Sequence, residues 1–542
     1  MLFLRSVTSW RAAALSLAVA AMLLPASAAF AESSQSQDSG DGALAVSPGK
    51  CIGTSSAAAT AWLKGTYSFR VTEIDLGGSE VPSWILGAFT ADGKGHLTVI
   101  GDANGPQSTG DAHATASGSY SIAGSGRGQL TFVIANFETL NFCIALDSLS
   151  NGVATAGHMV SDKGTASVFQ GRFFAQGGKG FSVASAKGSW VFGMQGAKMY
   201  GEKPGRQTFA GFVNLDGKGK ITGGELDYNN NKYSNGVLQN QYAAEVPITG
   251  TYTLASNGRG TFTTQLHSGG KIVNTSHSVF YIAGPGQILI MSSDAGLNQA
   301  NPNKNNSIVT GNGYLRTEST FRNASLSGNS VVVFNGLDVK GKGPTVGAGI
   351  FTFSGKRTFN GIADTTRSNG SGPGEVFTNA LYRVDAKGRF TVSGGDPNWG
   401  NLYLVGRNWG IGVQSGTSAN LTQLLRQTVP AGGFRAGSIT GGYSAGTIWY
   451  AFADQTARSG ELTVDKANKT IVGIFDEDTA GSFHLDEAST ISYEAESNGR
   501  FLLMDGGKIG AFLFLVSPYR GFVLPYQKWP IVYEINSFDQ AP

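Results

Sequence analysis

The chain has 542 residues, of which 78 are glycine, 11% are aromatic and only 14% are charged. Its formal net charge of +3 is small for this length, so there is no electrostatic basis for binding nucleic acid or an anionic membrane surface. Beyond the N-terminal region no segment reaches about 18 consecutive apolar residues, and we therefore expect no transmembrane helix.

The N-terminus has the parts of a secretory signal peptide. Basic residues precede an apolar run at 12–26, and small residues follow it. This order predicts a signal peptide over residues 1–31, cleaved after Ala31. The protein should therefore be exported, to an extracellular, cell-surface or periplasmic location. The next segment, residues 32–62, begins with small polar residues and is interpreted as a flexible N-terminal linker.

The chain contains two cysteines, Cys51 and Cys143. An exported protein can carry a disulfide bond. Cys51 precedes the first repeat described below, whereas Cys143 lies in an apolar run at 139–146, so a bridge would attach the N-terminal arm to the first domain. Two separate thiols are the alternative.

One pattern occurs four times along the chain. A tyrosine is followed seven residues later by an arginine that comes directly after a glycine, in the pairs Tyr120 and Arg127, Tyr252 and Arg259, Tyr382 and Arg389, and Tyr493 and Arg500. A turn-rich segment lies upstream in each copy, at 91–97, 215–221, 353–359 and 464–471. A glycine and a strand-like segment open each copy further upstream. Three landmarks in a constant order indicate a repeated unit of domain size.

The best-preserved copy of the pattern, "ITGTYTLASNGRGTFT" at 248–263, has the features of a β-hairpin. Tyr252 and Leu254 alternate with threonines, which gives one apolar strand face. Gly258 then supplies the positive φ that a tight turn requires. The tandem hairpins predict antiparallel strands throughout, and the one stretch with a weak helical pattern is 419–428.

We therefore predict an all-β protein of four tandem antiparallel meander domains, each closed or nearly closed into a small barrel. Two-sheet β-sandwiches are the alternative. The predicted β-domains cover residues 63–176, 186–318, 325–428 and 438–535.

The Gly-x-Tyr strands, the "DGKG" turns at 92–95 and 216–219 and the "NGRG" turn at 257–260 resemble the tandem glycine-rich β-repeats of exported proteins from soil bacteria of the acidobacterial type. The resemblance covers most of 63–530 and is weakest in the third copy, where "SGKR" replaces "DGKG". It implies architecture and export, and it implies no activity.

A fainter resemblance is to calycin barrels such as lipocalins. These barrels open with Gly-x-Trp on the first strand, which "KGSW" at 187–190 matches, and they carry an arginine on the last strand. The arginines late in the first three copies are Arg172, Arg316 and Arg426. The third copy departs from the pattern with Ser330 at the aromatic position, and the fourth has Lys528 as its late cation.

The recurrent arginines and a set of recurrent aspartates are the candidate site residues. The arginines are Arg127, Arg259, Arg389 and Arg500, and the aspartates, ten or eleven residues after the upstream turn, are Asp102, Asp227, Asp364 and Asp476. An Arg–Asp pair in each domain could bind a polar ligand or latch one end of a barrel. Apolar neighbours alternate with the arginines, which predicts that the arginines point away from the core and have a structural or solvated role.

Other motifs for catalysis and metal binding are weak. The segment 441–446, "GGYSAG", fits the nucleophile-elbow pattern around Ser444, but it coincides with an opening strand of the repeat and not with a strand-to-helix turn. The six histidines show no pair at ligand spacing. Acidic segments at 475–481 and 225–231 could hold Ca²⁺, although neither has a full register of oxygen ligands. No catalytic residue, cofactor site or metal site is therefore assigned.

These observations predict a non-enzymatic exported protein that serves as a surface or extracellular binding or adhesive module, with a glycan, the matrix or a surface protein as partner. Tandem copies favour repeated binding, because they raise avidity. A second hypothesis is a carrier of small apolar ligands inside calycin-like barrels, with cavities lined by residues such as Phe69, Trp190, Phe192 and Trp449. A single large outer-membrane β-barrel and a secreted hydrolase are the remaining alternatives.

Overall fold

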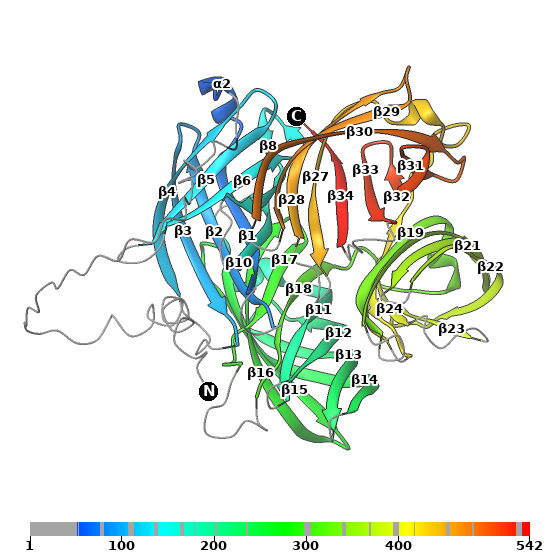
Figure 1. The fold of residues 1–542 in the computed structure, drawn as a ribbon. Helices are drawn as coiled ribbons and strands as arrows, with labels where there is room; N and C mark the ends of the chain where they lie inside the picture. Colours follow the sequence, from blue (N-terminus) through cyan, green and yellow to red (C-terminus); the bar gives the residue numbers. More distant parts are fainter. Residues whose placement is uncertain are drawn as a thin grey trace, which may run out of the picture.

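The computed structural model describes residues 51–541 apart from short segments at 52–53, 76–80, 107–112, 135–138, 163–166, 179, 201–202, 235–236, 297–304, 339–342, 368–369, 394–399, 417, 451–455, 480–481 and 527–533. The predicted signal peptide, most of the predicted linker and Lys528 lie outside the described residues. The described chain is all-β and forms four closed, eight-stranded antiparallel barrels in tandem (Figure 1). The predicted fold class is confirmed, and neither sandwiches nor one large barrel form.

Barrel 1 begins after the short helix α2 (Ala57–Thr60). Its strands are β1 (Lys64–Asp75), β2 (Ser83–Asp92), β3 (His96–Asn104), β4 (Ala114–Ile122), β5 (Arg127–Ile134), β6 (Thr139–Leu146), β9 (Ala156–Ser161) and β10 (Ser167–Ala175). A separate small hairpin consists of β7 (Leu149–Ser150) and β8 (Val153–Ala154). The barrel closes because β1 pairs with both β2 and β10. Cys51 and Cys143 form a disulfide bond that attaches the segment before α2 to β6.

Barrel 2 follows the 3₁₀ turn η2 (Val183–Ala186) and has the longest strands. They are β11 (Gly188–Tyr200), β12 (Lys203–Leu215), β13 (Lys220–Ser234), β14 (Val237–Leu254), β15 (Arg259–Ser268), β16 (Lys271–Gly284), β17 (Gln287–Ser292) and β18 (Ile308–Leu315). Strand β11 pairs with both β12 and β18, which closes the barrel.

Barrels 3 and 4 repeat this plan after the 3₁₀ turns η4 (Asn323–Ser325) and η5 (Ala436–Ser438). Barrel 3 contains β19 (Ser327–Asp338), β20 (Gly343–Ser354), β21 (Thr358–Arg367), β22 (Gly370–Val384), β23 (Arg389–Ser393), β24 (Asn401–Gly406), β25 (Trp409–Val413) and β26 (Ser418–Arg426). Barrel 4 contains β27 (Gly441–Tyr450), β28 (Thr456–Asp465), β29 (Thr470–Thr479), β30 (Ser482–Ala495), β31 (Arg500–Asp505), β32 (Lys508–Ser517), β33 (Arg520–Pro525) and β34 (Glu534–Gln540).

Two local expectations need correction. The stretch 419–428, which has a weak helical pattern, lies mostly in strand β26. Most residues of this strand are buried, because it closes barrel 3 and both of its faces are covered over much of its length. The last strand extends to Gln540, beyond the expected domain boundary at 535, because β34 must pair with β27 to close barrel 4.

The repeated tyrosine holds the start of its barrel. It lies on the fourth strand, is at most 5% exposed in every copy, and donates a hydrogen bond to a main-chain carbonyl in the segment before the first strand. In barrel 3, for example, the Tyr382 hydroxyl donates to the carbonyls of Asn323 and Leu326, each at 3.0 Å. The short helical turns before the four barrels are therefore fixed to the barrels by the tyrosine.

The upstream turns are closed by a side chain that accepts backbone N–H groups. Asp92 Oδ1 accepts from Lys94 at 2.6 Å and from His96 at 3.1 Å. These bonds lower the pKa of Asp92 below its usual value, with the Lys94 amide as the main cause. Ser354 Oγ accepts from Lys356 and Thr358 in the same way, which explains why "SGKR" can replace "DGKG". The copies of the repeat therefore resemble each other most at the residues that form turns.

The four barrels form a ring (Figure 1). Apolar clusters join barrel 1 to barrel 2, around Trp84 and Tyr281, and barrel 2 to barrel 3, around Phe212 and Val413. A third cluster joins barrel 3 to barrel 4, where Ile350 belongs to the same group as Phe512. The ring closes because residues of barrels 1 and 4 share a fourth cluster, made by Cys51, Ile74, Cys143, Val160, Val168 and Ala457.

Candidate functional site

Barrel 2 contains a cavity of about 190 Å³. Its walls are apolar side chains from the barrel interior, including Trp190, Phe192, Val213, Leu226, Ile248 and Ile290. Two of the residues named for the carrier hypothesis, Trp190 and Phe192, therefore line one cavity. Phe69 instead packs in the core of barrel 1, and the side chain of Trp449 lies outside the description.

Strand register explains why barrel 2 is hollow while barrel 1 is filled. Barrel 1 packs phenylalanine rings together, with centroids 5.5 Å apart for Phe89 and Phe173 and 5.7 Å apart for Phe132 and Phe142. Equivalent positions of the two barrels can be found by counting strand pairs from the first strand and from the repeated tyrosine. At the positions of these four phenylalanines barrel 2 has smaller residues: Val213 for Phe89, Thr264 for Phe132, Ser278 for Phe142 and Gly313 for Phe173. At two neighbouring positions the change is the reverse, since Phe262 and Phe280 stand where barrel 1 has Leu130 and Ile144, and the cavity lies where the four rings are missing.

The mouth of the cavity is polar. His277 and Asp294 form a pair there, with Nδ1 and Oδ1 2.7 Å apart, and the amide N–H of His277 also donates to Asp294 at 2.8 Å. Lys198 lines the same cavity, with its ammonium 5.8 Å from the ring centroid of Tyr200. Burial lowers the pKa of Lys198, and the nearby charge of Lys232 lowers it further. A negatively charged group near Lys198 would favour the charged form of this lysine and so oppose both effects.

The recurrent arginines and aspartates come together, but across barrels and not within them. Each arginine begins the fifth strand of one barrel and bonds an aspartate on the third strand of the preceding barrel. The pairs are Arg259 with Asp102, Arg389 with Asp227, Arg500 with Asp364 and, across the closure of the ring, Arg127 with Asp476. The shortest N–O distances run from 2.5 to 2.8 Å.

These pairs are buried, so of the two roles expected for the arginines, structural or solvated, the solvated one is wrong. The alternation with apolar neighbours does point each arginine out of its own barrel, but a second barrel covers that face. The four aspartate side chains are at most 1% exposed, and Arg259 is the most exposed of the arginines at 19%. Because each buried charge has a partner, the pairs fix the register of one barrel on the next.

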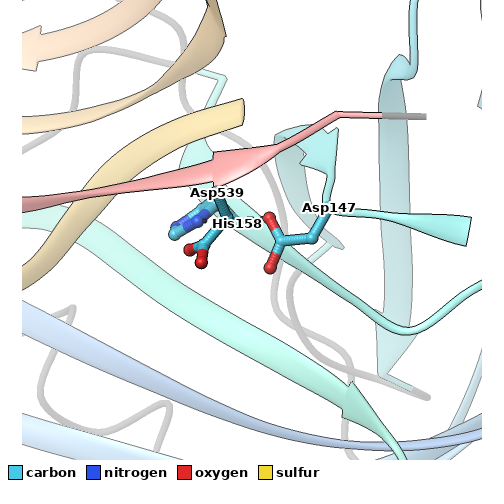
Figure 2. A group of neighbouring side chains, drawn as sticks. All are labelled: Asp147, His158 and Asp539. Carbon is cyan, nitrogen blue, oxygen red and sulfur yellow. Dashed lines mark ion pairs between the residues drawn. The ribbon is translucent and has the colours of Figure 1, made fainter. Parts of the chain in front are cut away.

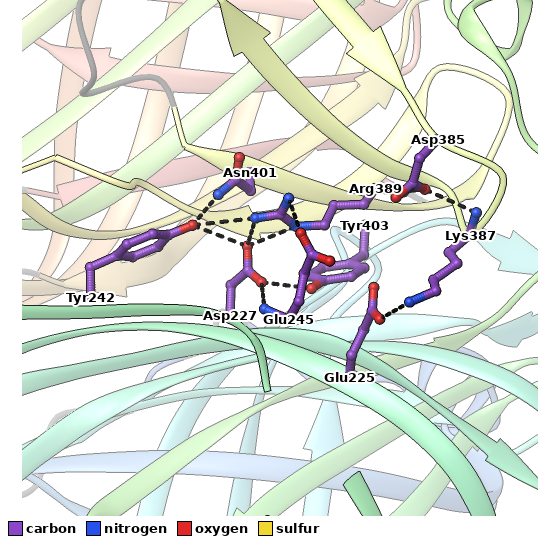
Figure 3. Close-up of polar contacts among 9 residues, drawn as sticks. All are labelled: Glu225, Asp227, Tyr242, Glu245, Asp385, Lys387, Arg389, Asn401 and Tyr403. Atoms are coloured by element: carbon purple, nitrogen blue, oxygen red, sulfur yellow. Dashed lines mark hydrogen bonds and ion pairs between the residues drawn. The ribbon is translucent and has the colours of Figure 1, made fainter. Parts of the chain in front are cut away.

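The interface between barrels 2 and 3 shows one such pair with its surroundings (Figure 3). Arg389 donates from Nε and Nη2 to Asp227 Oδ2, at 3.1 and 2.8 Å, and from Nη1 to Glu245 at 2.9 Å. Tyr403 donates to the other oxygen of Asp227 at 2.7 Å, and so does the amide of Glu245 at 2.8 Å. Beside them Lys387 bonds Glu225 at 2.5 Å. Asp227 is thus fully satisfied by groups of two barrels.

The interface between barrels 1 and 4 carries an additional acid. Arg127 bonds both Asp476 and Asp486 of barrel 4, each at 2.5 Å. Glu461, on β28, lies near the same guanidinium. Burial raises the pKa of Glu461 to about 7, although the attraction of Arg127 opposes that rise. This carboxyl group therefore changes its charge near neutral pH.

A second polar group at this interface brings together Asp147, His158 and Asp539 (Figure 2). The first two belong to barrel 1 and the third to β34. Arg172 donates to Asp147 at 2.7 Å and to Asp539 at 3.3 Å, so a guanidinium already neutralises the two carboxylates. Burial alone would raise the pKa of Asp147, but the charges of Arg172 and His158 and the hydrogen bonds to the carboxylate together lower it below its usual value. We therefore interpret the group as an inter-barrel contact and not as a metal centre.

The nucleophile-elbow pattern lies at the same interface. Ser444 is 0% exposed and donates to Asp147 at 2.6 Å, whereas the Nε2 of His158 faces Ser537 Oγ at 2.8 Å. A hydrolase would need the serine on the histidine and open to substrate. Gly446 of the pattern packs against the His158 imidazole, where a Cβ would lie 2.6 Å from Nδ1. These residues join two barrels.

The described part of the acidic segment 475–481 belongs to β29, and the segment 225–231 belongs to β13. Their acids bond cationic or hydroxyl groups: Asp476 with Arg127, Asp478 with Ser161, Glu477 with Arg458, Asp227 with Arg389, and Glu225 with Lys387. Their oxygens are therefore directed to separate partners and do not converge on a shared ion. The late arginines of the calycin comparison likewise lie outside the barrel interiors, with Arg172 paired to Asp147 and Arg316 stacked on Phe212 at 4.2 Å.

No family model and no curated protein matches this chain. Among solved structures, a protein of unknown function from the DUF3598 family of Nostoc punctiforme aligns over 48% of this chain and 99% of its own. The identity is 10% and the TM-score is 0.14. A likeness of this size supports no functional conclusion, so the site must be interpreted from its own geometry. Within the described residues no helix combines the length and apolarity needed to span a bilayer.

Proposed function

We propose that this protein is an exported, non-enzymatic binding protein that carries one small amphipathic ligand in the cavity of barrel 2. The observation that carries the proposal is the replacement of four interior phenylalanine positions by smaller residues, which leaves about 190 Å³ inside a closed apolar barrel. A dry apolar cavity of about 150 Å³ is large enough to bind benzene. The ligand would therefore have an apolar body of one or two rings or an equivalent short chain.

The polar mouth of the barrel 2 cavity suggests which head group the ligand carries. Lys198 lines the cavity and its ammonium is partly desolvated. An acidic head group would stabilise the charged form of Lys198, whereas a cationic one would destabilise it further. The acid of the mouth, Asp294, already contacts His277 at 2.7 Å. A ligand with a carboxylate beside its apolar body fits both parts of the site. The other barrels would serve as a rigid frame in this proposal.

Surface adhesion ranks second. That hypothesis expects aromatic side chains displayed for glycan or matrix contact, but the large exposed apolar side chains of the described residues are aliphatic except for Tyr519. They are also scattered over different barrels. Exposed single residues of this kind are normal on a soluble protein.

Native mass spectrometry of the signal-cleaved protein, purified without detergent, tests the proposal. We expect co-purified extra mass, or a single adduct on addition of naphthalene-2-carboxylate. Thr264→Phe restores the ring that barrel 1 has at this position, and it should abolish the adduct. Thr261→Phe, on the outer face of the same strand, is the matched control and should bind like the wild type. Equal binding by the wild type and Thr264→Phe would disprove the proposed site.

The head group is tested separately. Lys198→Met should weaken binding of naphthalene-2-carboxylate about tenfold, by loss of one charge contact, and should leave binding of neutral naphthalene unchanged. Lys232→Met removes a neighbouring charge outside the cavity lining and serves as control. An equal loss for both ligands would indicate that Lys198 shapes the cavity and does not bind the head group.

A further inference from the structure

A second cavity, of about 40 Å³, lies where the four barrels meet. Barrel 1 contributes Arg70 and Gln170, barrel 2 contributes Arg206 and Asn312, barrel 3 contributes Gln423, and barrel 4 contributes Ile448. We call this space the central cavity. First, second and last strands of the barrels line it, so it belongs to the ring as a whole and to no single domain.

The described lining of the central cavity contains two arginines and no carboxylate. Arg206 is 2% exposed and donates to the side-chain oxygen of Gln195 at 2.7 Å. The side-chain hydrogen bond described for Arg70 is a long one, 3.4 Å to Asn312 Oδ1. Burial lowers the pKa of Arg70 to about 10, and the charge of Arg172 adds to that effect. Among the described residues, Arg70 therefore has no carboxylate partner of the kind that the inter-barrel arginines have in their aspartates.

Amide groups complete the lining. Gln170 is 5% exposed, and its Oε1 has no hydrogen-bond partner among the described residues. Rotation of this amide by half a turn would instead present its NH₂ group, and the two orientations are not distinguished by shape. Asn312 and Gln423 can provide N–H donors in the same way. Guanidinium and amide donors around a small space are the groups that hold an oxyanion.

We propose that the central cavity binds one small oxyanion, a tetrahedral inorganic anion or a carboxylate, through Arg70 with support from Arg206 and the amide side chains. A water molecule needs about 10–15 Å³ of such space, so a cavity of about 40 Å³ accommodates a group of a few heavy atoms. The anion would neutralise buried positive charge and would link all four barrels. This inference is independent of the ligand proposed for barrel 2.

Titration of the full, signal-cleaved chain with sulfate, phosphate and acetate at constant ionic strength provides the test. We expect one anion per chain by calorimetry and a saturable rise in unfolding temperature. Arg70→Gln should weaken binding at least tenfold. Arg357→Gln removes an equal charge from an exposed turn and should behave like the wild type, which separates site binding from the general stabilising effect of these salts.

Gln170→Glu gives a test that does not depend on losing an arginine. It places a carboxylate in the lining, so the variant should be more stable than the wild type without added anion and should no longer respond to it. A wild-type protein without saturable binding would overturn the proposal, as would equal binding by wild type and Arg70→Gln. The three anions also separate a tetrahedral site from a planar carboxylate site.

Discussion

Asp364 is 0% exposed and receives two N–H groups from Arg500 of the next barrel, at 2.6 and 2.9 Å. Asp364→Asn should lower the free energy of unfolding by about 3 kcal/mol, because the buried guanidinium of Arg500 then keeps only Glu496, an exposed acid 2.6 Å from its Nη1, as counter-charge. Chemical denaturation measures the change. Asp505→Asn, at the exposed end of β31, is the control and should change stability by less than about 0.5 kcal/mol.

A double variant that removes both members of the pair tests the same explanation in the opposite direction. Replacing both Asp364 and Arg500 by apolar residues of similar size should recover much of the loss, since the acid that loses its cation, Glu496, is 37% exposed and stays solvated. A single Asp364→Asn variant as stable as the wild type would show that the guanidinium reaches water and that the pair is not a buried latch.

Glu461 gives the interface between barrels 1 and 4 a pH dependence. Below about pH 4.5 the carboxyl is protonated in both states, and between 4.5 and about 7 it ionises only in the unfolded chain. The contribution of Glu461 to stability therefore falls as pH rises through this window, by at most about 3 kcal/mol.

Glu461→Gln removes this titration. The variant should match the wild type near pH 4 and should unfold at a higher temperature than the wild type at pH 8. Thermal unfolding across this range provides the measurement, and Glu487→Gln, an exposed acid of the same barrel, is the control. A constant difference between variant and wild type at every pH would contradict the assignment.

At the scale of the element, the tyrosine on the fourth strand connects each barrel to the turn before it. Tyr382→Phe keeps the ring in the core but leaves the carbonyls of Asn323 and Leu326 without this donor. We expect a loss of about 1–2 kcal/mol. Tyr519→Phe, at a position 62% exposed, should have no measurable effect in the same denaturation experiment. Equal stability of all three proteins would mean that water replaces the hydroxyl.

The sequence predicts the turns and the strand faces of each barrel well. The turns at Asp92 and Gly258 require particular residue types, and alternation around Tyr252 predicts the apolar face, so hairpins and barrels follow from the repeat. The contacts of Arg389 do not follow in the same way. Its outward direction is predictable, but its partner Asp227 lies in another barrel, and no local pattern encodes which barrel covers that face.

The hollow of barrel 2 could be found from sequence only after strand register is known. Thr264 and Ser278 are ordinary strand residues when taken alone. They indicate a cavity only by comparison with Phe132 and Phe142, which occupy the equivalent positions of barrel 1. Long-range pairing fixes that equivalence. The central cavity is still further from local patterns, because four separate domains contribute to it.

At the scale of the molecule, the closed ring predicts cooperative unfolding. Every barrel shares an apolar cluster and an Arg–Asp pair with each of its two neighbours. Calorimetry should show one transition, and Asp102→Asn and Asp476→Asn, at different interfaces, should each lower that same transition. Separate transitions for individual barrels would show that the interfaces contribute little to stability, and the ring would then be an arrangement of independent domains.

Because barrel 4 contacts barrel 1, the ring could form even if the chain began with a different barrel. Asp539, near the C-terminal end, lies 3.3 Å from Arg172 of barrel 1, so the last barrel adjoins the first without a backbone connection. A circular permutant that joins the described ends by a flexible linker and begins at the join 317–325 or 427–437 would keep every strand and every inter-barrel pair. Barrel 3 or barrel 4 could then be the first to leave the ribosome.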